Sequence, residues 1–179
     1  MWRQPGEAAC TWSLRRTEAA SDTALLGRFL RDLSYGSRYF RFGHGDAVLG
    51  EAEIASLCSP DPREGVAYIL TCEGDTGTAA VGLAGYCVDA DDGCELALVV
   101  ADAWQGRGMG RRLIAALADD ARRRGLRTMT GRVLATNQRM LACARRLGFE
   151  IQPWADSRVV LRVVLRAVLR LDGAPHDTA

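Results

Sequence analysis

Apolar residues recur along this chain with two different spacings, and these spacings predict strands alternating with helices. Alternating or unbroken apolar runs are typical of strands, and they occupy residues 11–17, 66–72, 79–88, 94–101, 126–134 and 149–152. Apolar residues three and four positions apart predict helices, which we expect from Ser21 or Asp22 to Leu33, over 51–57, from the glycine-rich turn to Gly125, and over 137–147. Together they predict one mixed α/β (α+β) domain over residues 11–171.

Two segments are less clear. RYFRFGHGD (38–46) is aromatic, basic and interrupted by glycine, so we expect a loop there. RVVLRVVLRAVLRL (158–171) fits a helix, since its arginines recur every four residues, and also fits a half-buried strand; its valines favour the strand for the first half. We expect residues 1–10 to be flexible and residues 172–179 to form a disordered tail.

Composition narrows the class of protein. The formal net charge is +1, so no overall field attracts nucleic acid or an anionic membrane, and no apolar run reaches the ~20 residues of a membrane span. The six cysteines are scattered and there are only two histidines, so we expect no metal site. Scattered thiols and the lack of a signal-peptide core at the start predict a cytoplasmic protein. All 23 basic residues are arginine.

A glycine-rich turn, QGRGMG (105–110), follows the apolar run 94–101 and precedes a helix. Free N–H groups at a helix N-terminus, reached through glycines, bind phosphate. A P-loop needs a lysine, which the chain lacks, and the dinucleotide fingerprint needs glycine where Arg111 stands. The remaining pattern, Q/R-x-x-G-x-G/A, is met by Gln105, Gly108 and Gly110.

That pattern resembles the coenzyme A pyrophosphate loop of the GNAT superfamily of N-acetyltransferases. The segment from Asn137 to the Leu-Gly-Phe that ends at Phe149 resembles the asparagine-led segment of the same family. The resemblance implies a GNAT fold: a central, mostly antiparallel sheet of six to seven strands, about four flanking helices, and a V-shaped splay between the fourth and fifth strands. It also implies acetyl-CoA as co-substrate, held by Val99, Val100, Gln105, Gly106, Arg107, Gly108, Met109, Gly110, Arg111, Arg112 and Asn137. Arginine opposes the dipole at a helix N-terminus, so we expect Arg107 or Arg112 to contact a phosphate.

For catalysis, the resemblance implies direct attack of an amine on the thioester, with Glu95 as general base. Glu95 is the only acid in CELALVVA, and burial beside apolar side chains would raise its pKa toward that role; a strand-end carboxylate paired with arginine is the alternative. Many family members protonate the leaving thiolate with a tyrosine seven residues after the asparagine, where this chain has Ala144. Tyr86 or Tyr39 could replace it.

The acceptor is predicted from a second resemblance. FLRDLSYGSRYFRFGHGD, with its L-S-x-x-S-x-Y-x-R-F order, and the E-x-A-x-x-V-x-D-x-W-Q-G order around residues 95–106 resemble Pat-type protein lysine acetyltransferases. This resemblance implies a protein lysine as acceptor, contacted by Tyr39, Arg41 and Phe42. The alternatives are a small amine of aminoglycoside or polyamine type and a silent acyl-CoA-binding regulator. The small amine would be held by acidic residues, namely Asp89, Asp91, Asp92, Glu51 and Glu53. A homodimer is left open.

Overall fold

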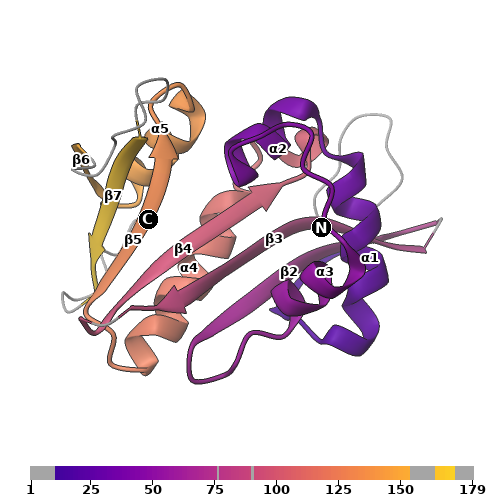
Figure 1. Ribbon diagram of the computed structural model, residues 1–179, viewed down its shortest axis with the longest axis horizontal. Coiled ribbons are helices and arrows are strands. Elements are labelled where there is room, and N and C mark those ends of the chain that lie inside the picture. Colours follow the sequence, from indigo (N-terminus) through magenta and orange to yellow (C-terminus); the bar gives the residue numbers. More distant parts are fainter. Residues whose placement is uncertain (1–10, 76, 90, 154–163, 172–179) are drawn as a thin grey trace.

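The computed structural model describes residues 11–75, 77–89, 91–153 and 164–171, which build one seven-stranded sheet (Figure 1). The strands lie in the order β1-β2-β3-β4-β5-β7-β6. Their bounds are β1 Thr11–Arg16, β2 Gly65–Gly74, β3 Gly77–Val88, β4 Gly93–Val100, β5 Thr128–Leu134, β6 Glu150–Pro153 and β7 Val164–Arg170. All neighbours are antiparallel except β4 and β5. The mixed, mostly antiparallel fold predicted from the sequence is confirmed.

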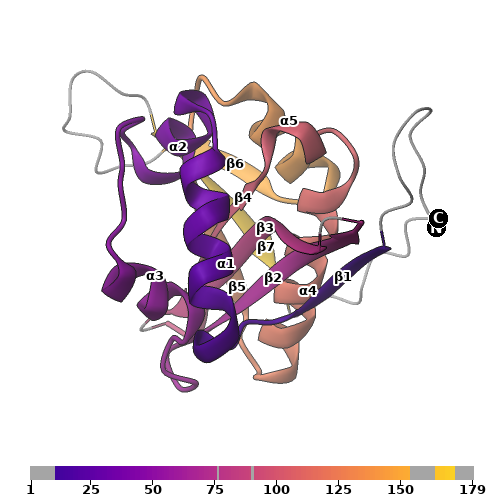
Figure 2. The ribbon, with the colours of Figure 1, turned by 90° about the vertical axis from the view of Figure 1, so that its right-hand side faces the viewer.

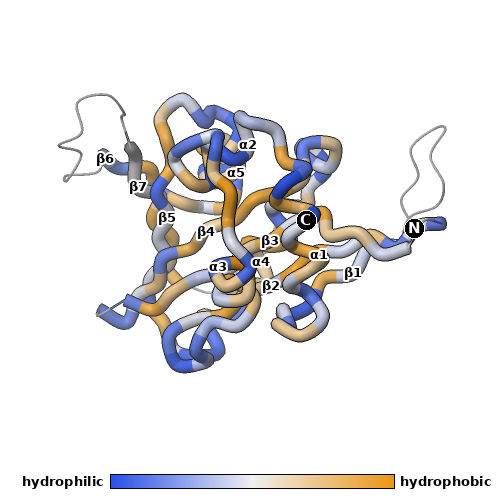
Figure 3. Tube along the Cα trace, turned by 45° about the vertical axis from the view of Figure 1, so that its right-hand side comes forward, coloured by the Kyte–Doolittle hydropathy of each residue, from blue (hydrophilic) through white to orange (hydrophobic). Residues whose placement is uncertain are grey.

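Helices cover both faces of the sheet. They are α1 Ala19–Asp32, α2 Tyr35–Phe42, α3 Glu51–Cys58, α4 Met109–Arg123 and α5 Gln138–Arg146, with a short 3-10 turn η1 at Asp102–Trp104. Seen from the side, α1 and α3 lie on one side of the central strands and α4 lies on the other (Figure 2). Apolar colour is concentrated along the middle strands, and hydrophilic colour gathers on outer helical turns and connecting loops (Figure 3).

Each helical layer closes its own core. One core packs Leu113, Ile114 and Leu117 of α4 against even-numbered residues of β4 such as Leu96 and Val100. The other packs Leu26 and Leu30 of α1 against the opposite face, where Val99 of β4 lies. Because side chains alternate along a strand, β4 supplies residues to both cores, as its nearly continuous apolar run requires.

The sheet splits between β4 and β5. These two strands pair only at Gly93–Glu95, opposite Thr128–Thr130, whereas β3 and β4 pair from Cys94 through Val100. Beyond Glu95 the two strands diverge, and a V-shaped gap between their ribbons is visible in Figure 1. The splay expected between the fourth and fifth strands is present.

The loop predicted for 38–46 is wrong over residues 38–42, because residues 35–42 form α2, whereas residues 43–46 lie outside any helix or strand. The side chain of Ser34 caps this helix by accepting from the N–H of Ser37. Gly43 ends it in the left-handed conformation, at φ 83°, and donates to the carbonyl of Tyr39. Serine before a helix and glycine after it are short-range capping signals. Ser34 and Gly43 could therefore have predicted both ends of α2 from the sequence.

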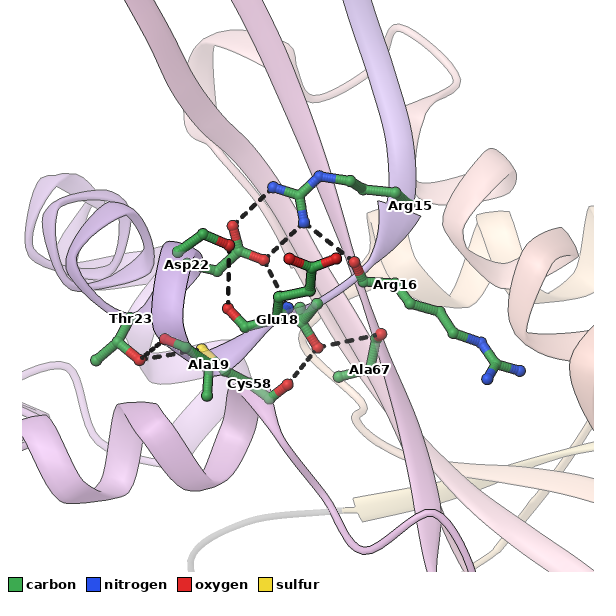
Figure 4. A network of polar contacts seen from close by, with 10 residues as sticks. Arg15, Arg16, Glu18, Ala19, Asp22, Thr23, Cys58 and Ala67 are labelled. Atoms are coloured by element: carbon green, nitrogen blue, oxygen red, sulfur yellow. Dashed lines mark hydrogen bonds and ion pairs between the residues drawn. The ribbon is translucent and has the colours of Figure 1, made fainter.

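The start of α1 also differs from the prediction. The helix begins at Ala19, with Glu18 at the N-cap position and no side-chain cap, so neither Ser21 nor Asp22 caps it. Instead the buried Asp22 lies inside the first turns, where it accepts from the N–H of Glu18 at 2.8 Å and from both terminal nitrogens of Arg15, each at 2.7 Å (Figure 4). The Asp22 carboxylate thus satisfies a backbone N–H at the start of α1, and its negative charge lies near the positive end of the helix dipole.

The ambiguous C-terminal segment is a strand where it is described. Residues 164–170 form β7, which pairs antiparallel with both β5 and β6. Residues 158–163, for which valine favoured a strand, lie outside the described residues, as do the flexible start expected for 1–10 and the tail expected for 172–179. In the described ranges no helix is long and apolar enough to cross a membrane.

Candidate active site

The splay leaves the C-terminal half of β4 with an edge that pairs with no strand. Ala101 donates its N–H to Val81 on the β3 side at 2.9 Å, whereas the carbonyl of Val100 accepts from Gln105 Nε2 at 3.0 Å on the other side. Since successive residues of a strand turn their backbone groups to opposite edges, Leu98 shares the open edge with Val100. Val99 is turned toward β3. The sequence named Val99 and Val100; the register adds Leu98 as the second residue with backbone groups on this edge.

The glycine-rich turn brings a helix N-terminus to the same place. Gly106 and Gly108 have φ of 75° and 81°, and Gly108 is the N-cap of α4 without a side chain to cap it. The first α-helical hydrogen bond of α4 runs from the N–H of Arg112 to the carbonyl of Gly108 at 3.1 Å. The N–H groups of the preceding first-turn residues therefore point out of the helix. A Cβ at Gly110 would lie 3.6 Å from Leu98, which shows how closely the turn packs on β4. Met109 anchors it in the core.

Arginines surround this helix N-terminus as the sequence predicted, and two of them lie over tryptophans. The guanidinium carbon of Arg107 is 5.5 Å from the ring centre of Trp104, and that of Arg112 is 4.5 Å from the ring centre of Trp12. Arg111 is exposed. No acidic residue lies in the first turn of α4. Stacking on an aromatic face holds a guanidinium in place beside the helix N-terminus.

A polar network that sequence reasoning missed joins the turn to α2. The carboxylate of Asp102 accepts from the N–H of Ser34 at 2.9 Å, from Ser34 Oγ at 2.7 Å and from Ser37 Oγ at 2.8 Å. Gln105 Nε2 donates to Ser37 Oγ at 3.0 Å as well as to Val100. Burial would raise the pKa of Asp102, but the hydrogen bonds from Ser34 and Ser37 hold it below its usual range. The serines of the L-S-x-x-S pattern therefore contact the aspartate and glutamine of the D-x-W-Q pattern. The presence of both patterns in the sequence was the signal that could have predicted this contact.

Glu95 lies where β4 and β5 begin to separate, opposite Thr130. Its side chain is 40% exposed and its Oε1 accepts from Arg132 Nε of β5 at 2.5 Å, so the burial expected for it is not found. Arg41 of α2 faces the same region: burial lowers its pKa, while the nearby Cys87 thiol and Glu95 carboxylate act in the opposite direction. The guanidinium carbon of Arg41 also lies 4.9 Å from the ring centre of Phe42. The structure therefore brings Glu95 and Arg41 into one polar region.

The other predicted residues divide between the site and the core. Tyr39 is half-buried on α2, with its ring edge-on to Phe40. Asn137 caps α5, accepting from the N–H of Met140 at 3.1 Å. Ala144 is buried in the core.

Tyr86 does not lie in this region. Its hydroxyl donates to Asp120 at 2.6 Å within the core under α4, and burial followed by that contact raises its pKa far above the ordinary value. A phenol bound in this way cannot donate to a leaving group at the splay. Across the described part of the chain, no group of three or more His, Cys, Asp or Glu side chains could hold a metal ion.

Comparison with known proteins agrees with this geometry. The profile of the Acetyltransferase (GNAT) family matches residues 31–149. The acetyltransferase PA5475 of Pseudomonas aeruginosa is 34% identical over 149 residues, which are 77% of this chain and 76% of that protein. Among solved structures, the GNAT domain of S. lividans PAT is 24% identical with a TM-score of 0.76, over 88% of this chain and 89% of that one.

The structure of yncA from Salmonella typhimurium, solved with its cofactor acetyl-CoA, is 20% identical with a TM-score of 0.70, over 93% of this chain and 99% of that one. An open edge on β4, a glycine turn that presents a helix N-terminus beside it, and a family profile spanning both features point to one class of enzyme. The chain belongs to the GNAT family of acetyltransferases and is an acyl-CoA-dependent N-acetyltransferase.

Proposed function

We propose that this enzyme transfers the acetyl group of acetyl-CoA to the side-chain amine of a protein lysine, with Glu95 as general base. The observation that carries the proposal is the position of Glu95 at the point of the splay, where the open edge of β4 begins. A donor held along that edge would bring its thioester toward the carboxylate.

Backbone groups would provide most of the binding site for acetyl-CoA. The pyrophosphate would bind the first-turn N–H groups of α4, reached through Gly106 and Gly108, with Arg107, Arg111 and Arg112 supplying positive charge. The pantetheine arm would pair with the open edge at Leu98 and Val100 as an added strand does. Asn137 and Gln105 would complete the wall on the α5 side, where Arg139 donates to Gln105 Oε1 at 3.4 Å.

In the reaction, the amine nitrogen attacks the thioester carbon and a C–N bond forms, which moves an electron pair onto the carbonyl oxygen. An N–H on the open edge of β4 would stabilise that oxyanion. When it collapses, the C–S bond breaks and the thiolate leaves, while Glu95 takes the proton from nitrogen, directly or through a water. With alanine at position 144 and Tyr86 held by Asp120, Tyr39 is the candidate proton donor that is left from those named from the sequence. Because a thiolate is a good leaving group, we expect the step to proceed without an acid.

The surface beside the site favours a protein acceptor. The large apolar side chains most exposed to solvent among the described residues are Tyr35, Phe40 and Val48, with 59%, 42% and 85% of their surface accessible. All three lie on α2 or in the segment that follows it. Exposed apolar side chains on one helix and the segment after it are consistent with a surface that contacts another protein.

Two of the acids named for a cationic small amine, Asp89 and Glu53, take part in local backbone structure. Asp89 accepts from the N–H groups of Asp91 and Gly93 in the β3–β4 turn. Glu53 accepts from the N–H of Gly50 at the start of α3. Because these carboxylates serve turns and caps, they favour the small-amine alternative less than their number in the sequence did.

The general-base role is tested with Glu95→Gln, measured as kcat/KM for acetyl-CoA and acceptor from pH 6 to 9. General bases contribute about 10²–10⁴-fold, so we expect a loss of kcat/KM in that range. Arg132→Gln is the matched control, because it removes the partner of Glu95 and keeps the carboxylate. Turnover of Glu95→Gln near that of the unmodified enzyme across this pH range would reject the assignment.

The acceptor is tested by measuring thiol release from acetyl-CoA with lysine-containing proteins and, separately, with polyamines and aminoglycosides. We expect acetyl-lysine on protein, identified by mass spectrometry, at rates that exceed those with every small amine. Faster turnover of a polyamine or aminoglycoside would replace the protein acceptor by the small one.

A further inference from the structure

The contact between the glycine-rich turn and α2 does more than fix the fold. We propose that Asp102 is a positioning residue that couples coenzyme binding at the turn to the order of α2, the helix that would line the acceptor side. The place of α2 on that side rests on the proposed function; the coupling itself concerns the coenzyme site alone.

On the α2 side, Asp102 meets the first turn of the helix with both carboxylate oxygens. One oxygen accepts from the N–H of Ser34, and the other accepts from the hydroxyls of Ser34 and Ser37. Ser34 in turn caps the helix through the N–H of Ser37. The negative charge also lies at the positive end of the α2 dipole, where it stabilises the helix. An eight-residue helix is too short to be stable alone, so this anchor contributes much of its order.

On the coenzyme side, the same network reaches the backbone that would hold the donor. Asp102 begins the 3-10 turn that leads into the glycine-rich segment, and its carbonyl accepts from the N–H of Gln105 at 3.3 Å. Gln105 joins the two halves, since its side-chain amide donates to Ser37 on α2 and to Val100 on the open edge of β4. A ligand along that edge therefore touches a strand and a turn that share hydrogen bonds with α2.

Coenzyme binding can be coupled to the order of α2 because two of the residues that join them are exposed to water. Ser34 and Asp102 are exposed, so in the free enzyme their hydrogen bonds compete with water. A coenzyme that orders residues 102–110 lowers the entropy cost of keeping the same bonds to α2, and an ordered α2 favours coenzyme binding by an equal factor. Residues at the C-terminal end of α2, including Arg41 and Phe42, would become ordered together with its anchored first turn.

The test is hydrogen exchange of the intact enzyme with and without coenzyme A, followed at the amides of residues 37–43. In the unmodified protein we expect coenzyme A to slow these amides by about 5-fold or more, the lower end of typical coupling factors. In Asp102→Asn, which keeps the shape of the side chain and loses its charge, the slowing should fall to less than half. Asp46→Asn, an exposed acid that follows α2, is the matched control and should behave as the unmodified protein.

A second variant keeps the proposal testable if Asp102→Asn folds poorly. Ser37→Ala removes the hydroxyl shared by Asp102 and Gln105 and should also reduce the slowing. Equal slowing of the α2 amides in all four proteins would overturn the coupling, and so would no slowing in the unmodified one.

Steady-state kinetics separate this failure from failure of the acceptor proposal. Loss of coupling should raise KM for whichever amine is the acceptor several-fold, with a smaller change in kcat. Coenzyme-induced slowing of α2 with turnover of small amines alone would retain the coupling and reject the protein acceptor. Acetylation of protein lysine without slowing would do the reverse.

Discussion

Glycines at alternate positions in the 105–110 turn serve different purposes. Gly106 and Gly108 have positive φ, which costs a residue with a Cβ roughly 1–2 kcal/mol. Gly110 is already inside α4 with an ordinary helical backbone, and a Cβ there would meet Leu98 at a normal contact distance of 3.6 Å. The pattern G-x-G/A of the motif matches this difference, because alanine is tolerated only at the last position.

We therefore expect Gly108→Ala and Gly110→Ala to separate clearly. Strain at position 108 should tilt the first-turn N–H groups of α4 and weaken coenzyme A binding by about 5- to 30-fold, the equivalent of 1–2 kcal/mol. Gly110→Ala should change the Kd by less than 3-fold. Isothermal titration calorimetry measures both, and equal losses in the two variants would show that the backbone of Gly108 is not what the ligand needs.

At the scale of elements, α2 shows how a distant residue can decide secondary structure. The interior of α2 has Tyr35, Tyr39 and Phe42 at helical spacing, but its glycine and arginines also fit a loop. It is a helix because Ser34 and Gly43 cap it and because Asp102, 65 residues away from Ser37 in the chain, anchors its first turn. That partner comes from another element, and no local pattern reports it.

Two cysteines on neighbouring strands differ in exposure, which predicts a difference in their reactivity. Cys87 of β3 is an exposed thiol, whereas Cys94 of β4 is fully buried under α4, and burial raises the pKa of Cys94 to about 12. Alkylation needs an accessible thiolate. At pH 8 we expect iodoacetamide to modify Cys87 at least ten times faster than Cys94, as measured by peptide mass spectrometry.

Unfolding in urea is the control, because it should make the two thiols react at similar rates. Rapid modification of Cys94 in the folded protein would contradict its placement beneath α4.

At the scale of the whole molecule, two buried carboxylates form salt bridges that join β1 to the helices on both faces of the sheet. Asp22 binds Arg15 and holds β1 to α1, while Asp120 of α4 binds Arg16 of β1 and the hydroxyl of Tyr86. The Arg15 guanidinium is the main cause that holds the pKa of Asp22 below its usual range. Burial would raise the pKa of Asp120, but its bonds to Tyr86 and Arg16 lower it. The edge strand is thus tied to the fold by charge as well as by its ladder with β2.

These carboxylates predict an acid-labile fold. A pKa lowered by folding adds stability that is present above the ordinary aspartate value, near 3.9, and is lost as the pH falls through the folded value. We expect Asp22→Asn to cost about 2–3 kcal/mol at pH 7, less than the loss of a fully buried ion pair, because Arg15 is 40% exposed. It should also make the decline in stability below pH 4 shallower.

Urea unfolding at pH 7, 5, 4 and 3 measures both effects. Asp32→Asn, an exposed acid at the end of α1, is the matched control and should follow the unmodified protein. A decline below pH 4 that is as steep in Asp22→Asn as in the unmodified protein would exclude Asp22 as a source of acid lability.

The sequence by itself determined the elements that carry strong local periodicity and the chemistry that depends on spacing. The apolar run of β4 and the amphipathic pattern of α4 predicted a strand, a glycine-rich turn and a helix N-terminus in that order, and the resemblance of Gln105, Gly108 and Gly110 to a family motif implied that the turn binds coenzyme A. These features are local, because a strand or a helix N-terminus is specified by residues a few positions apart.

Tertiary structure decided what depends on partners far apart in the chain. It turned Leu98 and Val100 to the open edge, paired Glu95 with Arg132, placed Tyr86 in the core and joined Asp102 to Ser34 and Ser37. Strand register and long-range hydrogen bonds decide these contacts, and periodicity contains neither.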